Sequence, residues 1–133
     1  MSKSIGLLCI DDNPLVAEAL ARRIALESDF RWLGWLSGRE DIAERVGALE
    51  PDIVLLDIDL PGVDAFEVVS LLSEKSPESR VVMFTGFDRP EYQEQALARG
   101  AWGYISKDVA TGALLSSLRR VANGEVALDD DRS

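Results

Sequence analysis

The chain has 133 residues, 47% of them hydrophobic, which suits one compact domain with a full core and is too short for two ordinary domains. Its 24 acidic and 14 basic residues leave a formal net charge of -10, which would repel nucleic acid and anionic membranes. The chain has no histidine, which excludes a Ser-His nucleophile and a histidine-ligated zinc.

The first predicted element is a short apolar strand, Ile5–Ile10, which ends in the acidic pair Asp11 and Asp12. Asn13 is a candidate N-cap followed by proline, so an amphipathic helix is predicted over Pro14–Leu26. No signal-peptide pattern precedes the strand, and no apolar run approaches a membrane span. We therefore expect a cytoplasmic protein without a membrane partner.

An edge strand is predicted over Phe30–Ser37, which is apolar and aromatic but contains an arginine and a glycine. Strand alternation places Trp32 and Trp35 on opposite faces, and both are expected to pack under neighbouring helices. A short helix is predicted over Glu40–Leu49, and Pro51 prevents it from continuing into the next strand.

The rest of the chain is organised around the segment IVLLDIDLPG, Ile53–Gly62. Its unbroken apolar start indicates a strand buried on both faces, as in a parallel sheet. The strand stops at Asp57, which leaves a carboxylate at the edge where open α/β sheets bind ligands. The next helix begins near Asp64, which forms a capping-box-like pair with Glu67.

The last third of the chain repeats this alternation. Arg80–Thr85 is another buried run that ends in a hydroxyl, and Pro90–Arg99 is a predicted helix with only a weak apolar stripe, which suggests mobility. Ala101–Ser106 is the fifth predicted strand, and Lys107 follows it before a final amphipathic helix.

The alternation of strands and helices along the whole chain predicts an α/β fold with a doubly wound, five-stranded parallel sheet and five helices. The domain is assigned to residues 1–124, and 125–133 to an acidic tail or linker stub.

The polar residues that follow these strands should meet at one edge of the sheet: Asp11, Asp12, Asp57, Thr85 and Lys107. Taken singly, each residue can be explained by an ordinary structural role: a helix cap, a turn hydroxyl or a solvated surface charge. Taken together, three carboxylates repel one another unless a cation joins them, and oxygen ligands without histidine favour Mg²⁺. A lysine and a hydroxyl beside them complete a site suited to a phosphoryl group.

This pattern resembles the receiver domain of a two-component response regulator. The resemblance is carried by Asp11-Asp12, the LLDIDLPG block around Asp57, Thr85 followed by glycine, and Tyr104 three residues before Lys107. It implies a flavodoxin-like fold with strand order 2-1-3-4-5. It also implies a phosphoacceptor signalling domain that catalyses at most its own phosphorylation and dephosphorylation, rather than an enzyme.

The resemblance further implies a role for each site residue. Asp57 would accept a phosphoryl group from the phosphohistidine of a sensor histidine kinase and would contribute to Mg²⁺ binding. Asp12 would bind Mg²⁺ directly, Asp11 mainly through water, and the backbone carbonyl of Asp59 would supply a further ligand. Lys107 would stabilise charge on the transferred group.

Thr85 and Tyr104 are the implied switch residues. Thr85 would move toward the phosphoryl group, and Tyr104 would then swing inward. The movement would change the surface made by the fourth helix, fifth strand and fifth helix, through which the resemblance implies partner binding or a homodimer. A cis peptide after Lys107 is not expected, because Asp108 stands where the family often has proline.

The ending GYISKDVATGALLSSLRRVANGEVAL is similar to the NarL/FixJ subfamily, whose receivers precede a helix-turn-helix domain. This similarity implies transcription regulation, with DNA bound only through an output domain absent from this chain. No such domain fits after Leu128, so the chain would be an excised receiver or would act alone.

Two other readings share parts of the pattern. A phosphorylation-independent interaction module of the same fold would usually have lost a site residue, whereas all are present here. A haloacid-dehalogenase-like phosphatase would use Asp57 and Asp59 as its D-x-D pair. That motif normally ends the first strand and is followed by threonine where this chain has Pro61, which argues against it.

Overall fold

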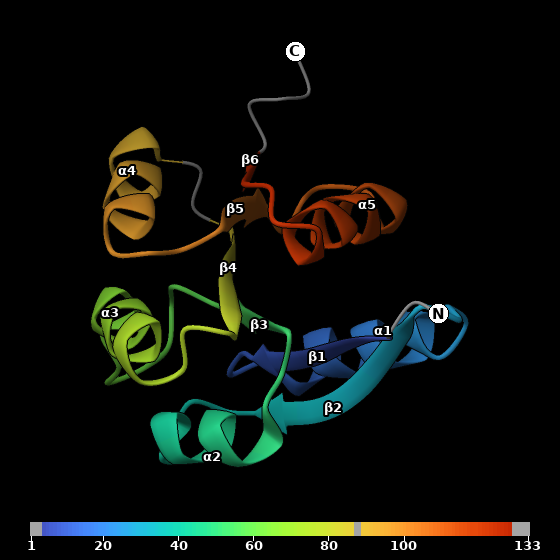
Figure 1. The fold of residues 1–133 in the computed structure, drawn as a ribbon, viewed down its shortest axis with the longest axis horizontal. Helices are drawn as coiled ribbons and strands as arrows, with labels where there is room; N and C mark the ends of the chain where they lie inside the picture. The colour runs from blue at the N-terminus through green and yellow to red at the C-terminus, as the bar shows by residue number, and fades with distance from the viewer. Residues whose placement is uncertain (1–3, 87–88, 129–133) are drawn as a thin grey trace.

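A computed structural model describes residues 4–86 and 89–128 of the chain. These residues form one sheet with helices on both faces (Figure 1). The elements are β1 (Ile5–Ile10), α1 (Pro14–Ile24), β2 (Phe30–Leu36), α2 (Ile42–Leu49), β3 (Ile53–Leu56), α3 (Ala65–Lys75), β4 (Arg80–Thr85), α4 (Pro90–Ala98), β5 (Gly103–Ser106), α5 (Thr111–Ala122) and β6 (Ala127–Leu128).

The sheet order is β2-β1-β3-β4-β5-β6, and every neighbouring pair is parallel. The doubly wound α/β fold and the order 2-1-3-4-5 are therefore confirmed. The prediction of five strands missed β6, which lies inside the expected tail 125–133. Two residues are too short for a periodic pattern, but Ala127 is fully buried and its N–H donates to the carbonyl of Trp102 at 3.0 Å. Residues 129–133 lie outside the described part.

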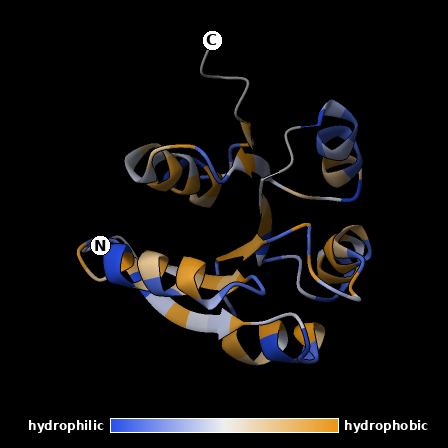
Figure 2. Cartoon of the chain, turned by 180° about the vertical axis from the view of Figure 1, so that it is seen from behind, coloured by the Kyte–Doolittle hydropathy of each residue, from blue (hydrophilic) through white to orange (hydrophobic). Residues whose placement is uncertain are grey.

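Two hydrophobic cores sandwich the sheet. One core joins the sheet to α1 and α5, and the other joins it to α2, α3 and α4. Figure 2 shows apolar segments on the sides of α1 and α5 and along the strands. All four residues of β3 are buried, as its unbroken apolar run predicts. No helix within residues 4–86 and 89–128 is both long and apolar enough to cross a membrane.

The N-terminus of α3 shows local capping of the predicted kind. The Asp64 carboxylate accepts from the backbone N–H groups of Phe66 and Glu67, at 3.0 and 3.3 Å. The Glu67 side chain, however, pairs with Arg99, the C-cap residue of α4, at 3.3 Å. The predicted cap is therefore present, and Glu67 connects two helices.

The edge strand β2 differs from its prediction. Trp32 pairs with Leu7 and Trp35 with Cys9, so both tryptophans lie on the α1 side of the sheet rather than on opposite faces. The register shifts by one residue between these pairs, at a β-bulge next to Gly34, whose φ is +137°. An extra residue in a strand reverses the facing of every later side chain, which simple alternation cannot anticipate.

Helix α4 has the least apolar contact, as its weak stripe predicts. Ala96 is its one buried residue within the described range, and its N-cap residue Arg89 makes no side-chain cap. Its C-terminal end is held more firmly: Arg99 donates to Ser70 at 3.2 Å, and the Ser73 hydroxyl donates to the Arg99 carbonyl at 3.0 Å. The contacts that hold α4 to α3 are thus concentrated at one end.

Candidate functional site

The parallel ladder brings the predicted polar residues to one edge. The Asp11 N–H donates to the Leu36 carbonyl at 3.0 Å, and the Asp57 N–H donates to the Ile10 carbonyl at 3.0 Å. In β4 and β5, the Lys107 N–H donates to the Thr85 carbonyl at 2.8 Å. These hydrogen bonds extend the pairing of β1, β3 and β5 one residue beyond their carboxyl ends, which fixes the backbone of Asp11, Asp57 and Lys107.

Three carboxylates meet at this edge. Asp11, Asp12 and Asp57 each offer one oxygen, and these oxygens lie within 4.8 Å of one another. Asp11 and Asp57 are buried, whereas Asp12 is exposed. This oxygen-only donor set, open to solvent on the Asp12 side, fits a hard divalent cation that retains water ligands.

Lys107 is the cation that the chain itself supplies to the cluster. Its Nζ donates to Asp11 Oδ2 at 2.7 Å and lies 3.5 Å from Asp57 Oδ2. The sequence placed Lys107 at this edge, and the structure adds that its shorter contact is with Asp11 rather than with Asp57. Because a buried carboxylate without a partner is costly, Lys107 compensates charge that the fold has removed from water.

The surroundings shift the proton affinities of Asp57 and Lys107. Burial raises the pKa of Asp57, and the charge of Asp11 adds to the rise, while the Asp59 N–H and Lys107 oppose it. Burial alone would lower the pKa of Lys107, but its hydrogen bond to Asp11 and the nearby carboxylate charges outweigh burial and raise it. Lys107 is therefore protonated at neutral pH and remains positively charged beside Asp57.

Thr85 and Tyr104, the predicted switch residues, lie on neighbouring strands and on the α3 and α4 side of the sheet. Thr85 is completely buried at the end of β4, and Tyr104 is 2% exposed and pairs with Met83 in the sheet register. The sequence predicted that Tyr104 swings inward after Thr85 moves. Tyr104 is already buried in this structure, and its movement after that of Thr85 stays a prediction.

Asp59 follows the cluster and projects differently from it. Its side chain is exposed, as expected for the mouth of the site, and its N–H donates to Asp57 Oδ1 at 3.2 Å. The hydrogen bond orients the Asp57 carboxylate. That the Asp59 carbonyl binds a metal ion stays a prediction. Every described peptide bond is trans, including the one between Lys107 and Asp108.

Sequence reasoning missed one contact at the site. The indole N–H of Trp35 donates to the backbone carbonyl of Asp11 at 2.6 Å. The sequence assigned Trp35 a packing role, yet 40% of the residue is exposed. An aromatic residue near the carboxyl end of a strand, beside an acidic loop, only weakly indicates a contact with that loop. The face on which Trp35 lies could not be predicted either, because the bulge in β2 reverses it.

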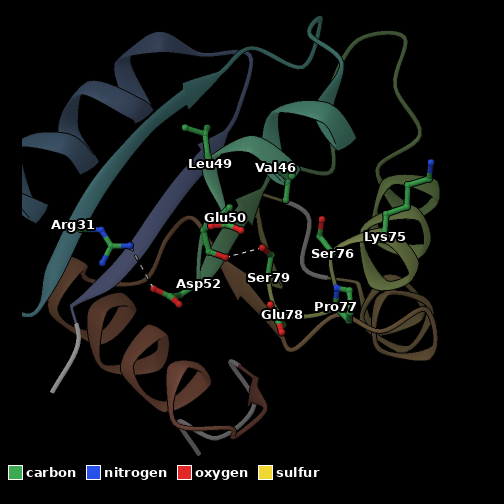
Figure 3. A pocket seen from close by; sticks show the side chains of 12 residues that line it. Arg31, Val46, Leu49, Glu50, Asp52, Lys75, Ser76, Pro77, Glu78 and Ser79 are labelled. Carbon is green, nitrogen blue, oxygen red and sulfur yellow. Dashed lines mark hydrogen bonds and ion pairs between the residues drawn. The ribbon is translucent and has the colours of Figure 1, made fainter. Parts of the chain in front are cut away.

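A cavity lies away from the carboxylate cluster. It has a volume of about 440 Å³ and opens at the amino ends of β2, β3 and β4, between the last turns of α2 and α3 (Figure 3). Arg31 and Asp52 pair within it at 4.0 Å, and the Ser79 hydroxyl donates to the Pro51 carbonyl at 2.6 Å. Asp57 lies at the carboxyl ends of the strands, so this cavity is not part of the carboxylate cluster.

Residues 7–119 match the family model described as response regulator receiver domain. The nitrate/nitrite response regulator protein NarL of Escherichia coli K12 is 36% identical over 124 residues, which cover 93% of this chain and 57% of NarL. The transcriptional regulatory protein MctR of Rhizobium johnstonii is 34% identical over 122 residues, 90% of this chain and 56% of MctR. The chain thus spans little more than half the length of these curated relatives.

Solved structures show the same likeness. The signal receiver domain of a response regulator named NarL from Mycobacterium tuberculosis superposes with a TM-score of 0.86 at 27% identity, covering 93% of this chain and all of that one. A LuxR-family DNA-binding response regulator from Staphylococcus aureus superposes with a TM-score of 0.81 at 27% identity, covering 90% of this chain and 99% of that one.

Proposed function

This chain belongs to the family of response regulator receiver domains, and on that premise we propose that Asp57 accepts a phosphoryl group from the phosphohistidine of a sensor histidine kinase. The supporting observation is the buried Asp57 carboxylate within 4.8 Å of two other carboxylates and 3.5 Å from a protonated lysine. One lysine cannot neutralise three carboxylates, so the cluster favours a site that takes up a further cation and a phosphoryl group over a structural ion pair.

The reaction would be an in-line displacement at phosphorus. A carboxylate oxygen of Asp57 forms the new O–P bond as the N–P bond of the phosphohistidine breaks, and the imidazole keeps the electron pair of that bond. Lys107, adjacent to Asp57, stabilises negative charge on the transferred group. The product is an aspartyl phosphate, and the domain acts as a signalling phosphoacceptor.

Asp12, Asp11, Asp57 and the Asp59 carbonyl would hold Mg²⁺, with Asp12 bound directly and Asp11 mainly through water. When bound, Mg²⁺ would neutralise charge on the phosphoryl oxygens. The proposal is tested by intact mass after incubation with Mg²⁺ and a small acyl phosphate. One phosphoryl group is expected, and chelator should prevent its addition; equal labelling in chelator would contradict the proposal.

The output would follow from Thr85, whose hydroxyl can reach a phosphoryl oxygen only if the end of β4 moves. Helix α4 packs on the same face of the sheet as Thr85 and has few apolar contacts to hold it, and β5 pairs with β4 beside Thr85. The surface expected to change is therefore that of α4, β5 and the adjoining α5. The resemblance to NarL and LuxR-type regulators supports a transcriptional role through an attached DNA-binding domain, and self-association through this surface.

Phosphorylation is expected to change amide hydrogen exchange within residues 90–122, because α4 is weakly packed above the switch residues. Helix α1 provides the internal control, because it packs beside β2, and β2 is separated from β5 by three strands of the sheet. The measurement compares the chain with and without a phosphoryl mimic by mass spectrometry. Unchanged protection throughout 90–122 would exclude this surface as the output.

Asp59→Asn is expected to change the phosphoryl lifetime or the loading rate by about three- to tenfold, or roughly 0.7 to 1.4 kcal/mol in barrier. The exposed carboxylate is placed to orient an attacking water or to repel an anionic donor. Loading and decay time courses at fixed Mg²⁺ measure both effects. Glu44→Gln removes one exposed charge from α2 and serves as the control. If the loading and decay rates of Asp59→Asn both agree with those of wild type within twofold, the Asp59 carboxylate has no role in either step.

A further inference from the structure

We propose that Trp35 is a positioning residue for the metal site: its indole N–H fixes the peptide between Asp11 and Asp12 and so sets the direction of the Asp12 carboxylate. The inference rests on the proposed function, because it concerns how this chain would hold Mg²⁺. Packing alone does not explain the position of Trp35, which is partly exposed and donates a hydrogen bond to Asp11.

All the polar groups of Asp11 have partners. Its N–H donates to the Leu36 carbonyl at 3.0 Å, and its own carbonyl accepts from Trp35 Nε1 at 2.6 Å. Its carboxylate accepts from the Asn13 N–H at 2.9 Å and from Lys107 Nζ at 2.7 Å. Four contacts from three directions therefore hold this residue, and two of them come from β2.

Asp12 has no such support. Its side chain is exposed, and no hydrogen bond or ion pair to it is found among residues 4–86 and 89–128. Its direction consequently depends on the backbone that carries it. The Asp11 carbonyl lies in the same rigid peptide plane as the N and Cα atoms of Asp12. A hydrogen bond to that carbonyl thus restrains the Cα from which the Asp12 carboxylate projects.

The bulge in β2 makes this contact possible. Leu7 pairs with Trp32, but Leu8 pairs with Gly34, so one residue is left out of the register and Trp35 turns to the α1 side. Bulges at sheet edges commonly redirect a side chain toward a functional site. A tryptophan retained only for packing would be well buried, whereas Trp35 is 40% exposed and its polar atom is bonded.

Trp35→Phe is expected to weaken Mg²⁺ binding about tenfold while keeping an aromatic ring on the strand. Outer-shell partners of metal ligands typically contribute about 10- to 100-fold to affinity, and a contact to the ligand's backbone belongs at the lower end. The Mg²⁺ dissociation constant of the whole chain is measured by calorimetry at fixed ionic strength. The unfolding free energy of each variant in chelator is measured alongside.

Trp32→Phe is the matched control. It makes the same substitution on the same strand and face, and the indole of Trp32 has no hydrogen-bond partner within the described residues. Trp32 is the more buried of the two tryptophans and packs against the α1 and α5 core. Its variant should therefore lose stability in chelator but keep Mg²⁺ affinity within twofold of wild type.

A second readout follows the hydrogen bond itself. In ¹⁵N-labelled chain, the Trp35 indole proton, assigned by its loss in Trp35→Phe, should resonate downfield of the Trp32 indole proton and should shift on Mg²⁺ addition. Trp35→Phe binding Mg²⁺ within twofold of wild type, or Trp32→Phe losing as much affinity, overturns the inference. Absence of Mg²⁺ binding by the wild type would instead remove the proposed function and this inference with it.

Discussion

Asp57→Asn should abolish the Mg²⁺-dependent phosphoryl group, because the amide lacks the anionic oxygen that attacks phosphorus. The substitution preserves size and leaves one oxygen that can still accept the Asp59 N–H, so the local fold is expected to persist. It also removes a buried carboxylate that crowds Asp11. The variant should therefore be folded, and its loss of labelling should be a loss of chemistry.

Intact mass and hydroxylamine lability measure this effect after incubation with donor and Mg²⁺. Asp108→Asn is the control, since Asp108 follows Lys107 without joining the carboxylate cluster. That variant should be labelled like wild type. Stoichiometric, hydroxylamine-labile labelling of Asp57→Asn would show that another residue receives the phosphoryl group.

Lys107→Met should slow phosphoryl loading about 100-fold, the effect typical of removing one group that stabilises charge in a transition state. The methionine keeps much of the side-chain length but leaves Asp11 and Asp57 without their shared cation. Initial rates of mass gain at saturating Mg²⁺ compare the two proteins. A loading rate within threefold of wild type would show that Lys107 serves only to pair buried charge.

Lys75→Met is the matched control for that experiment. Lys75 is an exposed lysine at the end of α3, near the amino ends of the strands, and the rate of phosphoryl loading of its variant should not change.

Lys107→Met should also lower the unfolding free energy in chelator at neutral pH, because it breaks a largely buried ion pair. The loss should shrink as the pH falls, since Asp57, whose pKa is already raised, then takes up a proton.

Much of the fold and of the candidate site could be predicted because the signals are local. An apolar run such as Ile53–Leu56 indicates a buried strand from its own composition. Parallel pairing then brings the residues that follow the strands to one edge of the sheet, which predicts that Asp57 and Lys107 lie close together; their side chains are 3.5 Å apart. A cap such as Asp64 depends only on residues two or three positions away.

Sequence alone therefore determined the first five strands, the five helices and the identities of the residues at the carboxyl ends of the strands. Tertiary structure alone decided the bulge that turns Trp35 toward Asp11, the burial of Tyr104 and the pairing of Ala127 beside β5. The physical reason is range: hydrophobic periodicity and capping act within one element, whereas register, facing and final hydrogen-bond partners are set by packing between segments far apart in the chain.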